Sequence, residues 1–465
     1  MAQNNMFDLM DKAEQKTEKR QKLIDSLPSW AYVNNRDIIH AKPDKLGREI
    51  LKKVKVMYVK NGKDLTLYRY NQNNGLWEIM TKEEIERIVT SMIDKINAWN
   101  AKDVSDTRKY IMNKAIIKQA RDTIDKVDPF KVHFKNGIYN LMTDKLEQNK
   151  PENYLFHGRN YNLDTNNTPT PLTDNWLDES VGDAKQYLME FIGYIFYRSY
   201  EKIQNFTILL ASGGNGKSTF FNWLSVAIGK DNISNISLQD LTDNTRRFTT
   251  SRLYQKNMNY YADISKGLIN DPALLKTVTG DDALDVEEKG KDQKTIKPFA
   301  KLFFGANELP PFKDTSKGFG RRPMIVEFNA IDDFNERFKM QEIKKEIPAF
   351  MYKCLKAFKK ALDRGYLSET PEMIKARNEW LNDNDVVGLF INEYCELKKS
   401  YYVKRIYLYD AYKSYCHDNG YRIMSNQKFR KELRRFDIKD KTKRMNNGST
   451  AKIYKGIRLI PTNKE

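Results

Sequence analysis

The chain is poor in cysteine and histidine. Its 465 residues include three cysteines, Cys354, Cys395 and Cys416, and four histidines. Because the cysteines lie far apart, we expect neither a disulfide framework nor a Cys-x-x-Cys metal site. We expect that Cys416 and His417 are adjacent by chance and do not form a pair of metal ligands.

Long apolar stretches are also missing. No stretch approaches the roughly 20 apolar residues that a membrane-spanning helix needs, and the charged segment 1–20 lacks the apolar core of a secretion signal. We therefore expect a cytoplasmic protein with no membrane partner. The length is sufficient for several domains with at least one sizeable core.

Positive charge is what the chain has in excess. The net charge is +18, from 80 basic and 62 acidic residues. Residues 386–465 alone contain 19 basic and 8 acidic side chains, so +11 of the +18 lies there. Charge concentrated in this way indicates a polyanionic partner, and nucleic acid is the one we expect beside a nucleotide-binding motif.

That motif is a glycine-rich run at 211–219. It follows an apolar stretch at 206–210, precedes a helical pattern at 220–228, and reads Ala211, Ser212, Gly213, Gly214, Asn215, Gly216, Lys217, Ser218, Thr219. In a phosphate-binding loop, backbone N–H groups surround a polyphosphate, the lysine reaches the outer phosphates and the serine hydroxyl ligates Mg²⁺. We therefore expect ATP and Mg²⁺ here rather than a simple surface turn. Ala211 replaces the usual glycine, which a strand end with negative φ tolerates.

Two polar residues follow later apolar strands. Asp263 ends a strand predicted at 258–262 and is the expected carboxylate for the magnesium of bound ATP, although a strand-end aspartate can also cap a turn. Its neighbours are Ala262 and Ile264 rather than a second acid, so no general base is assigned. Asn307 follows a strand at 301–305, where an amide can contact the γ-phosphate or the attacking water.

An arginine pair and a hairpin complete the motif set. Arg321 and Arg322 precede a strand at 324–328, and either guanidinium suits the arginine-finger role across a subunit interface. Segment 284–297 reads as a hairpin with its tip at 290–293, and the alternative is a solvated loop of mixed charge. The cations that we expect to contact a phosphate backbone from this hairpin are Lys289, Lys291 and Lys294.

The N-terminal part shows local patterns without specific chemistry. We predict a hairpin at 64–77 around the turn at 73–75, then a helix capped by Thr81. A second helix is predicted at about 107–124, a linker at 165–174, and a further helix at 184–200.

Spacing relates these motifs to a known family. Lys217 to Asp263 is 46 residues, Asp263 to Asn307 is 44 and Asn307 to Arg321 is 14. This compact order resembles the superfamily 3 helicases, which are AAA+ proteins, and in particular the phage and plasmid primase-helicases related to the poxvirus primase-helicase. Further similar elements are the Asn-Gly element at 133–141, Phe-Ile-Gly-Tyr at 191–194, and the segments 275–282, 303–310 and 320–322. In size and layout the chain is also similar to the replication initiators of staphylococcal pathogenicity islands.

The resemblance implies a homo-oligomeric ring, expected to be a hexamer, that hydrolyses ATP at its interfaces. It also implies 3′ to 5′ movement on single-stranded DNA drawn through the pore by the hairpins. The segment before the shared region offers no paired-aspartate motif with a partnered histidine, so no primase activity is expected.

The basic C-terminal segment fits a winged helix, and the resemblance to the pathogenicity-island initiators implies that it binds double-stranded origin DNA. We predict helices at 406–416 and 425–436 and a strand pair around 446–448, with the second helix in the major groove. The expected DNA-contacting side chains are Lys428, Arg430, Lys431, Arg434, Arg435, Lys443 and Arg444, although a solvated basic face would look the same.

The predicted architecture is α/β. It comprises an N-terminal arm at 1–63, a helical α+β domain at 64–170, an AAA+ ATPase domain at 171–384 and a winged-helix domain at 385–465.

Two other functions remain open. A DNA-packaging or DNA-repair ATPase would share the loop but lack the compact hairpin before Asn307, whereas a DNA-binding regulator with a vestigial ATP site is favoured only by Ala211 and the lone Asp263.

Overall fold

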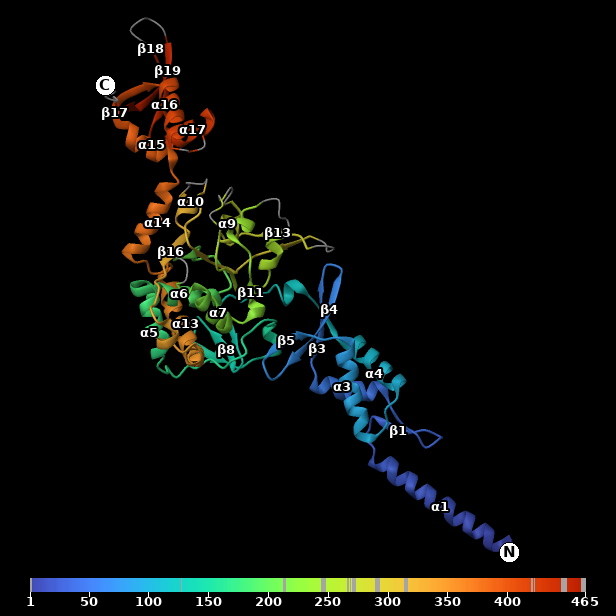
Figure 1. Cartoon of the computed structure of the whole chain (residues 1–465). Helices are drawn as coiled ribbons and strands as arrows, with labels where there is room; N and C mark the ends of the chain where they lie inside the picture. Colours follow the sequence, from blue (N-terminus) through green and yellow to red (C-terminus); the bar gives the residue numbers. More distant parts are fainter. Residues whose placement is uncertain are drawn as a thin grey trace.

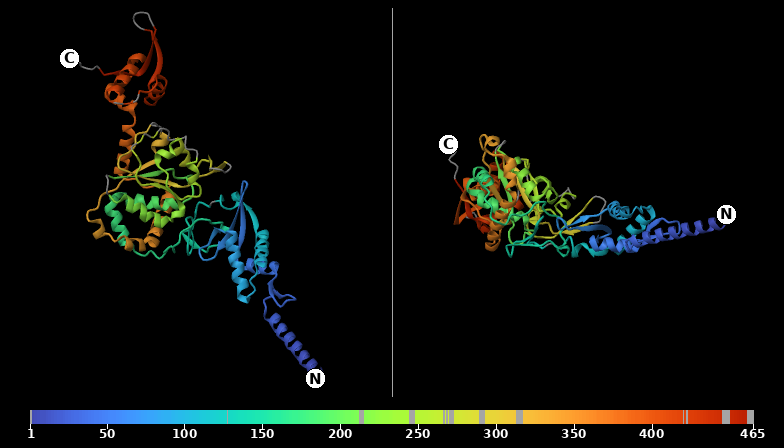
Figure 2. Two further views of the ribbon diagram at one scale, coloured as in Figure 1. Left: turned by 45° about the vertical axis from the view of Figure 1, so that its right-hand side comes forward. Right: turned by 90° about the horizontal axis from the view of Figure 1, so that it is seen from below.

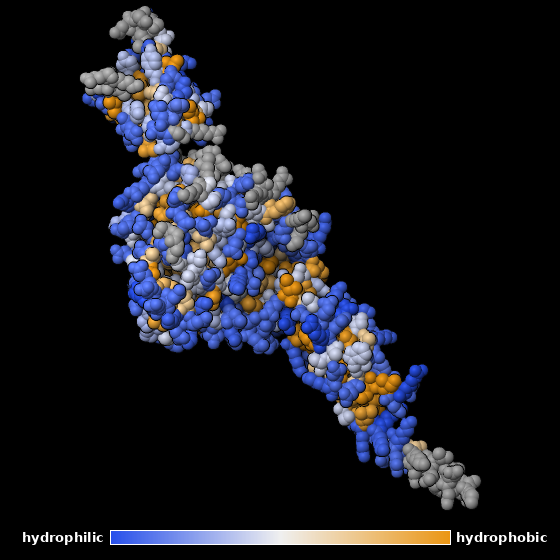
Figure 3. Space-filling view, in the orientation of Figure 1, coloured by the Kyte–Doolittle hydropathy of each residue, from blue (hydrophilic) through white to orange (hydrophobic). Residues whose placement is uncertain are grey.

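The protein is elongated, with a central α/β body between two smaller modules. The computed structural model describes residues 2–126, 128–211, 215–243, 248–265, 267, 269, 273–288, 293–312, 317–419, 421, 423–444 and 450–460. The N-terminal helix extends from one end and the C-terminal module from the other (Figures 1 and 2). The surface seen in Figure 3 is largely hydrophilic. Among the described residues, no helix has the length and apolarity to span a bilayer.

The N-terminal module combines helices with a four-stranded sheet of order β5-β4-β3-β6. Its elements are α1 (Ala2–Ser26), β1 (Ala31–Val33), β2 (Ile39–Ala41), α2 (Pro43–Lys53), β3 (Val56–Asn61), β4 (Asp64–Asn71), β5 (Leu76–Ile79), α3 (Lys82–Ile93), α4 (Ala101–Lys114) and β6 (Ile116–Gln119).

Local signals predicted part of this module correctly. The hairpin forms from β4 and β5, and Gly75 in its turn has φ +73°. Thr81 caps α3, as the sequence predicted, and the structure shows that the cap is a reciprocal capping box with Glu84. The helix expected at 107–124 is wrong beyond Lys114, because residues 116–119 form β6, which pairs in parallel with β3. Ile116 and Ile117 therefore lie on a sheet edge instead of a helix face.

The next segment joins the central body. It forms a three-stranded sheet of order β7-β8-β9, followed by two helices: β7 (Lys131–Phe134), β8 (Gly137–Asn140), β9 (Lys145–Glu147), α5 (Pro171–Val181) and α6 (Lys185–Phe196). Side chains of β7 and β8 belong to the same buried cluster as Trp176, Phe191 and Trp223. The boundary predicted at 170/171 therefore coincides with no break in packing. Pro171 begins α5, so the predicted linker is partly helical.

The body itself is built on a five-stranded parallel sheet of order β11-β12-β15-β10-β16. Its strands and the first helix are β10 (Phe206–Leu210), α7 (Lys217–Ile228), β11 (Ile233–Ser234), β12 (Met258–Tyr261), β15 (Lys301–Ala306) and β16 (Pro323–Glu327). The four strands predicted around the motifs are confirmed to within about two residues at each end.

Helices cover both faces of this sheet (Figure 1). One face packs on α6, α7 and α13, and the other packs on α8, α9 and α14. The remaining elements of the body are α8 (Leu238–Leu241), α9 (Ala273–Val278), β13 (Leu284–Val286), β14 (Lys294–Ile296), α10 (Lys317–Gly320), α11 (Phe334–Arg337), α12 (Met340–Lys345), α13 (Ile347–Arg364) and α14 (Pro371–Asp383). Because alternate strand residues face opposite sides, the nearly continuous apolar runs of β10 and β15 fill both cores.

The C-terminal module begins at α15, whose N-cap is Asp385. It contains α15 (Val386–Tyr394), β17 (Cys395–Lys404), α16 (Arg405–Asp418), α17 (Asn426–Leu433), β18 (Lys439–Arg444) and β19 (Thr450–Leu459), with sheet order β17-β19-β18. Both predicted helices are confirmed, although the second ends at Leu433 and continues as a 3-10 turn. The sequence did not predict β17, and the turn at 446–448 lies outside the described residues.

Candidate nucleotide-binding site

The 211–219 loop connects the carboxyl end of β10 to the amino end of α7. Gly216 has φ +84°, a left-handed conformation that glycine adopts without strain, and Lys217 is the first residue of the helix. Asn215 donates from Nδ2 to the Phe328 carbonyl at 3.1 Å, which ties the loop to the residue after β16. Ser218 is exposed and Thr219 is half-buried, whereas Ser212, Gly213 and Gly214 lie outside the described residues.

Lys217, Asn307 and Asp263 form one hydrogen-bonded chain at this edge of the sheet. The Lys217 Nζ donates to the Ala211 carbonyl at 2.7 Å and to Asn307 Oδ1 at 2.8 Å. Asn307 Nδ2 in turn donates to Asp263 Oδ1 at 3.3 Å. The sheet order explains the contact, because β15 lies between β12 and β10 and all three strands end at the same edge. Three residues that are 44 and 46 positions apart in sequence therefore meet in one place.

The charges at this edge suit a polyphosphate. Lys217 is only 8% exposed, and burial lowers the pKa of its ammonium group, while Asp263 has the opposite effect. The Lys217 ammonium group now donates to two neutral oxygens. Phosphate oxygens can take their place and form stronger, charge-assisted hydrogen bonds with it. Asp263 and Asn307 are exposed on the same edge and are accessible to a ligand there.

Gly305 allows this arrangement, and the sequence reasoning missed it. A Cβ at position 305 would lie 2.2 Å from the Ala262 carbonyl oxygen. The close approach lets the Ile264 N–H donate to the Gly305 carbonyl at 2.8 Å, which fixes the backbone on either side of Asp263. A glycine at the end of an otherwise bulky apolar strand was the available signal.

The two predicted arginines have different surroundings. Arg322 is 7% exposed, and its guanidinium donates to Thr279 Oγ1 at 2.9 Å and to the carbonyls of Gly318 and Lys276. Burial, and to a lesser degree the charge of Arg321, lowers the pKa of Arg322. Arg321 is exposed and donates to Gln204 Oε1 at 2.7 Å. Of the two, only Arg321 presents its guanidinium to solvent.

Both arginines lie at the sheet edge opposite the 211–219 loop. The Phe206 N–H, at the start of β10, donates to the Arg322 carbonyl at 2.9 Å, whereas the loop follows the other end of β10. A strand of this length spans roughly 16 Å. Neither arginine therefore contacts a nucleotide held by its own subunit, and a finger role requires a second copy of the chain.

The predicted hairpin is present as the antiparallel pair β13 and β14. Lys289 and Lys291 lie outside the described residues. Lys294 does not point freely from a tip: its Nζ lies 3.3 Å from Glu288 Oε1 and 3.2 Å from the ring centroid of Tyr254. This lysine stabilises the hairpin against the body, so its predicted DNA contact would require these interactions to break.

Sequence comparisons identify three matching segments. Residues 46–182 match a model described as D5 N terminal like, residues 209–322 match a family of unknown function, and residues 382–460 match a model described as Poxvirus D5 protein-like. Two of these three models are named for the poxvirus D5 protein, so the chain is similar to the D5-like family in its N-terminal and C-terminal parts.

One solved structure shows a similar fold, and two further matches are weaker. An apo structure of the NrS-1 C terminal region has a TM-score of 0.51 at 15% identity, covering 89% of this chain and 99% of that one. A second apo structure of that region has a TM-score of 0.47 at 16% identity, with the same coverage. A JCV helicase crystal structure matches at a TM-score of 0.24 and 12% identity, over 46% of this chain and 66% of that one.

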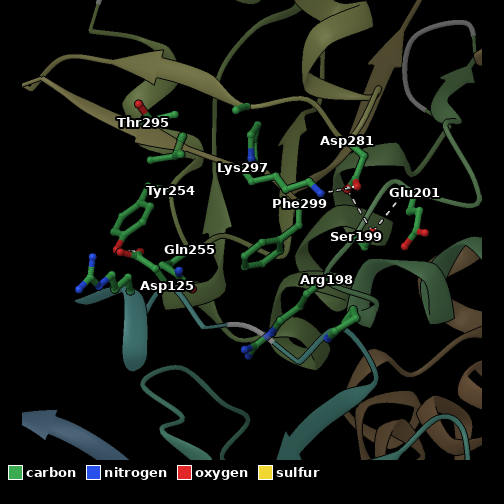
Figure 4. A pocket seen from close by; sticks show the side chains of 15 residues that line it. Asp125, Arg198, Ser199, Glu201, Tyr254, Gln255, Asp281, Thr295, Lys297 and Phe299 are labelled. Carbon is green, nitrogen blue, oxygen red and sulfur yellow. Dashed lines mark hydrogen bonds and ion pairs between the residues drawn. The ribbon is translucent and has the colours of Figure 1, made fainter. Parts of the chain in front are cut away.

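A cavity joins the D5 N terminal-like segment to the base of the hairpin (Figure 4). Its volume is about 510 Å³. On one side Tyr254 donates to Asp125 Oδ1 at 2.6 Å, and on the other Lys297 Nζ lies 2.5 Å from Asp281 Oδ2. Asp281 Oδ1 also accepts from Ser199 Oγ at 3.1 Å. The lining mixes both signs of charge, so the cavity favours no single class of ligand. The contact between Tyr254 and Asp125 links the body to the segment that follows β6.

The D5-like C-terminal module presents only some of its predicted cations to solvent. Arg435 donates to Asp385 Oδ1 at 2.7 Å, and Arg430 pairs with Asp440. Lys443 lies 3.4 Å from the ring centroid of Tyr402. The exposed residues of the predicted set are Lys428, Lys431, Arg434, Arg435 and Arg444, and Arg435 is the one among them that is paired with Asp385.

Proposed function

We propose that the protein is an ATP-driven DNA helicase that serves replication. The observation that carries the proposal is the chain Lys217, Asn307, Asp263 at one edge of the sheet, with the exposed Arg321 at the opposite edge. Similarity to the D5-like family supports a replicative role. In finer detail, we propose a superfamily 3 AAA+ ATPase with a C-terminal winged helix.

Each site residue has a defined task in this proposal. Lys217 donates to the outer phosphates, and the Ser218 hydroxyl and Asp263 hold Mg²⁺. The residues fit the ion, because the Ser218 side chain is exposed at the amino end of α7 and the Asp263 carboxylate lies on the same edge. Bound Mg²⁺ neutralises charge on the phosphates. Asn307 contacts the γ-phosphate or the water with the amide that now meets Lys217 and Asp263.

The 211–219 loop and Arg321 lie at opposite edges of the sheet, and this placement supports the proposed assembly. Because Arg321 lies away from its own loop, each complete site combines the loop of one subunit with Arg321 of the next, which favours a closed ring. We propose a hexamer that moves 3′ to 5′ on single-stranded DNA in its pore, and a C-terminal module that binds duplex origin DNA. The mobile-element setting, such as the pathogenicity-island initiators, rests on overall resemblance. Primer synthesis is not part of the proposal.

Strand displacement tests the proposal. Wild type should separate a forked duplex that carries a 3′ tail, with ATP and Mg²⁺, and should leave a fork with only a 5′ tail intact. Lys217→Ala should lose ATP hydrolysis and displacement together. Lys230→Ala, which removes an exposed lysine just after the far end of α7, is the matched control and should retain both.

A different result would redirect the assignment. Weak hydrolysis by wild type that DNA does not stimulate, without strand separation, would favour a DNA-binding regulator with a vestigial ATP site. DNA-stimulated hydrolysis with displacement of neither fork would favour a packaging or repair ATPase.

A further inference from the structure

The three-stranded sheet of the C-terminal module has one face on which five of the eight paired residues are lysines. Directly paired residues of antiparallel strands point to the same side, and alternate residues of each strand share that side. The pairing register therefore places the following residues on one face: Tyr402, Lys404, Lys439, Lys441, Lys443, Ala451, Ile453 and Lys455. We call this set the lysine face.

The opposite face of the same sheet is the one that packs on the helices. Tyr454 is 2% exposed and lies in the module core with Leu408 and Phe429. Asp440 points to this inner side as well, where Arg405 and Arg430 pair with it. The lysine face therefore lies on the side of the sheet away from the helical core.

No acidic residue balances the charge on the lysine face. The paired rows described above contain no aspartate or glutamate, and within the described part of the chain no ion pair involves these lysines. Lys439, Lys441 and Lys455 are exposed, and Lys404 and Lys443 are half-buried. Like charges held this close on a rigid sheet repel each other, so a polyanion that binds there gains from every one of them.

Tyr402 and Ile453 lie between the lysines on this face and form its apolar part. Ile453 is 4% exposed although it lies on the outer face, and the Lys443 Nζ lies 3.4 Å from the Tyr402 ring centroid. The aliphatic parts of the lysine side chains therefore cover Ile453, while Tyr402 remains 43% exposed. An exposed aromatic ring surrounded by cations can stack on a sugar or base while the cations meet phosphates.

The chemistry of the face distinguishes between kinds of partner. Protein interfaces are depleted in lysine and need an apolar centre, and here the exposed apolar area is little more than one tyrosine ring. Binding to a membrane surface favours apolar side chains that can enter the lipid, and the only isoleucine of this face is buried. A nucleic-acid backbone needs only regularly spaced cations, and alternate residues of β18 supply them at intervals of roughly 6.7 Å.

We propose that the lysine face is a second, sequence-independent binding site for a nucleic-acid backbone, in addition to the contact proposed for α17. The inference rests on the proposed function, in which the C-terminal module binds duplex DNA, and on the sequence-based expectation that α17 is the helix in the major groove. The two surfaces are distinct, since Lys428 and Lys431 belong to the helix and the lysine face lies on the far side of the sheet. The module can then hold one DNA segment on α17 and a second on the sheet.

Salt-dependent DNA binding by the full chain tests this proposal. The face variant carries Lys439→Ala, Lys441→Ala and Lys455→Ala, and the probe is a random-sequence duplex or an equally long single strand. Loss of three phosphate contacts should lower the slope of log affinity against log salt by about 2–3, which is about 10²-fold in affinity near 0.1 M salt. A triple Lys→Arg variant at the same positions should restore binding, which excludes misfolding as the cause.

A charge-matched control and a helix variant make the outcome specific. Lys339→Ala, Lys344→Ala and Lys360→Ala remove the same charge from the α12 and α13 region and should change the slope little. A helix variant with Lys428→Ala, Lys431→Ala and Arg434→Ala should lose affinity additively with the face variant. If the helix variant alone is unaffected, the proposed role of α17 fails while the lysine face stands.

Two results would overturn the lysine-face proposal. One is a face variant whose slope equals that of the control triple. The other is unchanged DNA binding together with lost sedimentation on vesicles that contain phosphatidylserine, which would assign the face to a membrane surface.

Discussion

Arg321 and Arg322 provide the sharpest test of the proposed assembly, because adjacent residues of the same type should fail in different ways. Arg322 is buried and makes three hydrogen bonds, whereas Arg321 is exposed and makes one to Gln204. Arg322→Ala should therefore destabilise the ATPase body, and Arg321→Ala should leave its stability nearly unchanged.

The expected changes in stability and in ATP hydrolysis follow from these contacts. A hydrogen bond to a charged group contributes about 1.5–3 kcal/mol, and losing the buried guanidinium also relieves its desolvation, so Arg322→Ala should cost about 3 kcal/mol or more. That lowers the unfolding temperature of a unit of about 200 residues by roughly 6–12 °C. Arg321→Ala should change stability by less than about 0.5 kcal/mol, yet reduce ATP hydrolysis by about 10³-fold or more if it is a finger.

A mixing experiment then asks whether Arg321 acts on a neighbouring subunit. Lys217→Ala and Arg321→Ala proteins should each be inactive alone. When equal amounts are assembled together, about a quarter of the interfaces pair an intact loop with an intact finger, so roughly a quarter of wild-type hydrolysis should return if sites act independently.

The control uses Arg87→Ala, which removes an exposed arginine from α3 and should have wild-type activity and stability. Mixed proteins that hydrolyse no more ATP than the sum of the separate ones would refute action in trans. Full activity of the Arg321→Ala protein on its own would also refute action in trans.

Two further predictions concern the sheet edge and the buried histidine. Gly305→Ala places a methyl group 2.2 Å from the Ala262 carbonyl, so the backbone beside Asp263 must shift, and ATP hydrolysis should fall by about 10²-fold while DNA binding without nucleotide persists. Burial lowers the pKa of His133 to about 4, below its unfolded value of roughly 6.5, so the unfolded state binds more protons between these values and stability falls as the pH drops. At pH 5 this histidine should cost about 2 kcal/mol relative to pH 7.5, and a His133→Gln protein whose thermal unfolding shows the same acid sensitivity would contradict the assignment.

The sequence predicted the strands that carry the candidate site residues better than it predicted the elements around them. The strands before the loop, Asp263 and Asn307 are short apolar runs that end in polar residues, and such runs are recognisable without knowledge of partners. Since all three belong to one parallel sheet, their carboxyl ends had to meet. The sequence could not show that Asn307 bridges Lys217 and Asp263, because that depends on β15 lying between the other two strands.

Non-local contacts explain the errors. Ile116 and Ile117 continue the apolar pattern of α4, but the chain leaves the helix at Lys114 to pair with β3, about 60 residues earlier. Arg321 and Arg322 are equivalent in sequence, and acceptors from Thr279, Lys276 and Gly318 distinguish the buried arginine from the exposed one. Lys294 was expected near a hairpin tip, but Tyr254 and Glu288 hold it.

The sheet β7-β8-β9 has a practical consequence for dividing the chain. Phe134, Tyr139 and Leu141 are fully buried in the same cluster as the helices that support the 211–219 loop. A fragment that starts near 171 would expose these partners of α6 and α13 and should aggregate, whereas one that starts near 128 keeps them. The smallest fragment that folds by itself and keeps the candidate site should therefore include a part of the chain that precedes the 211–219 loop.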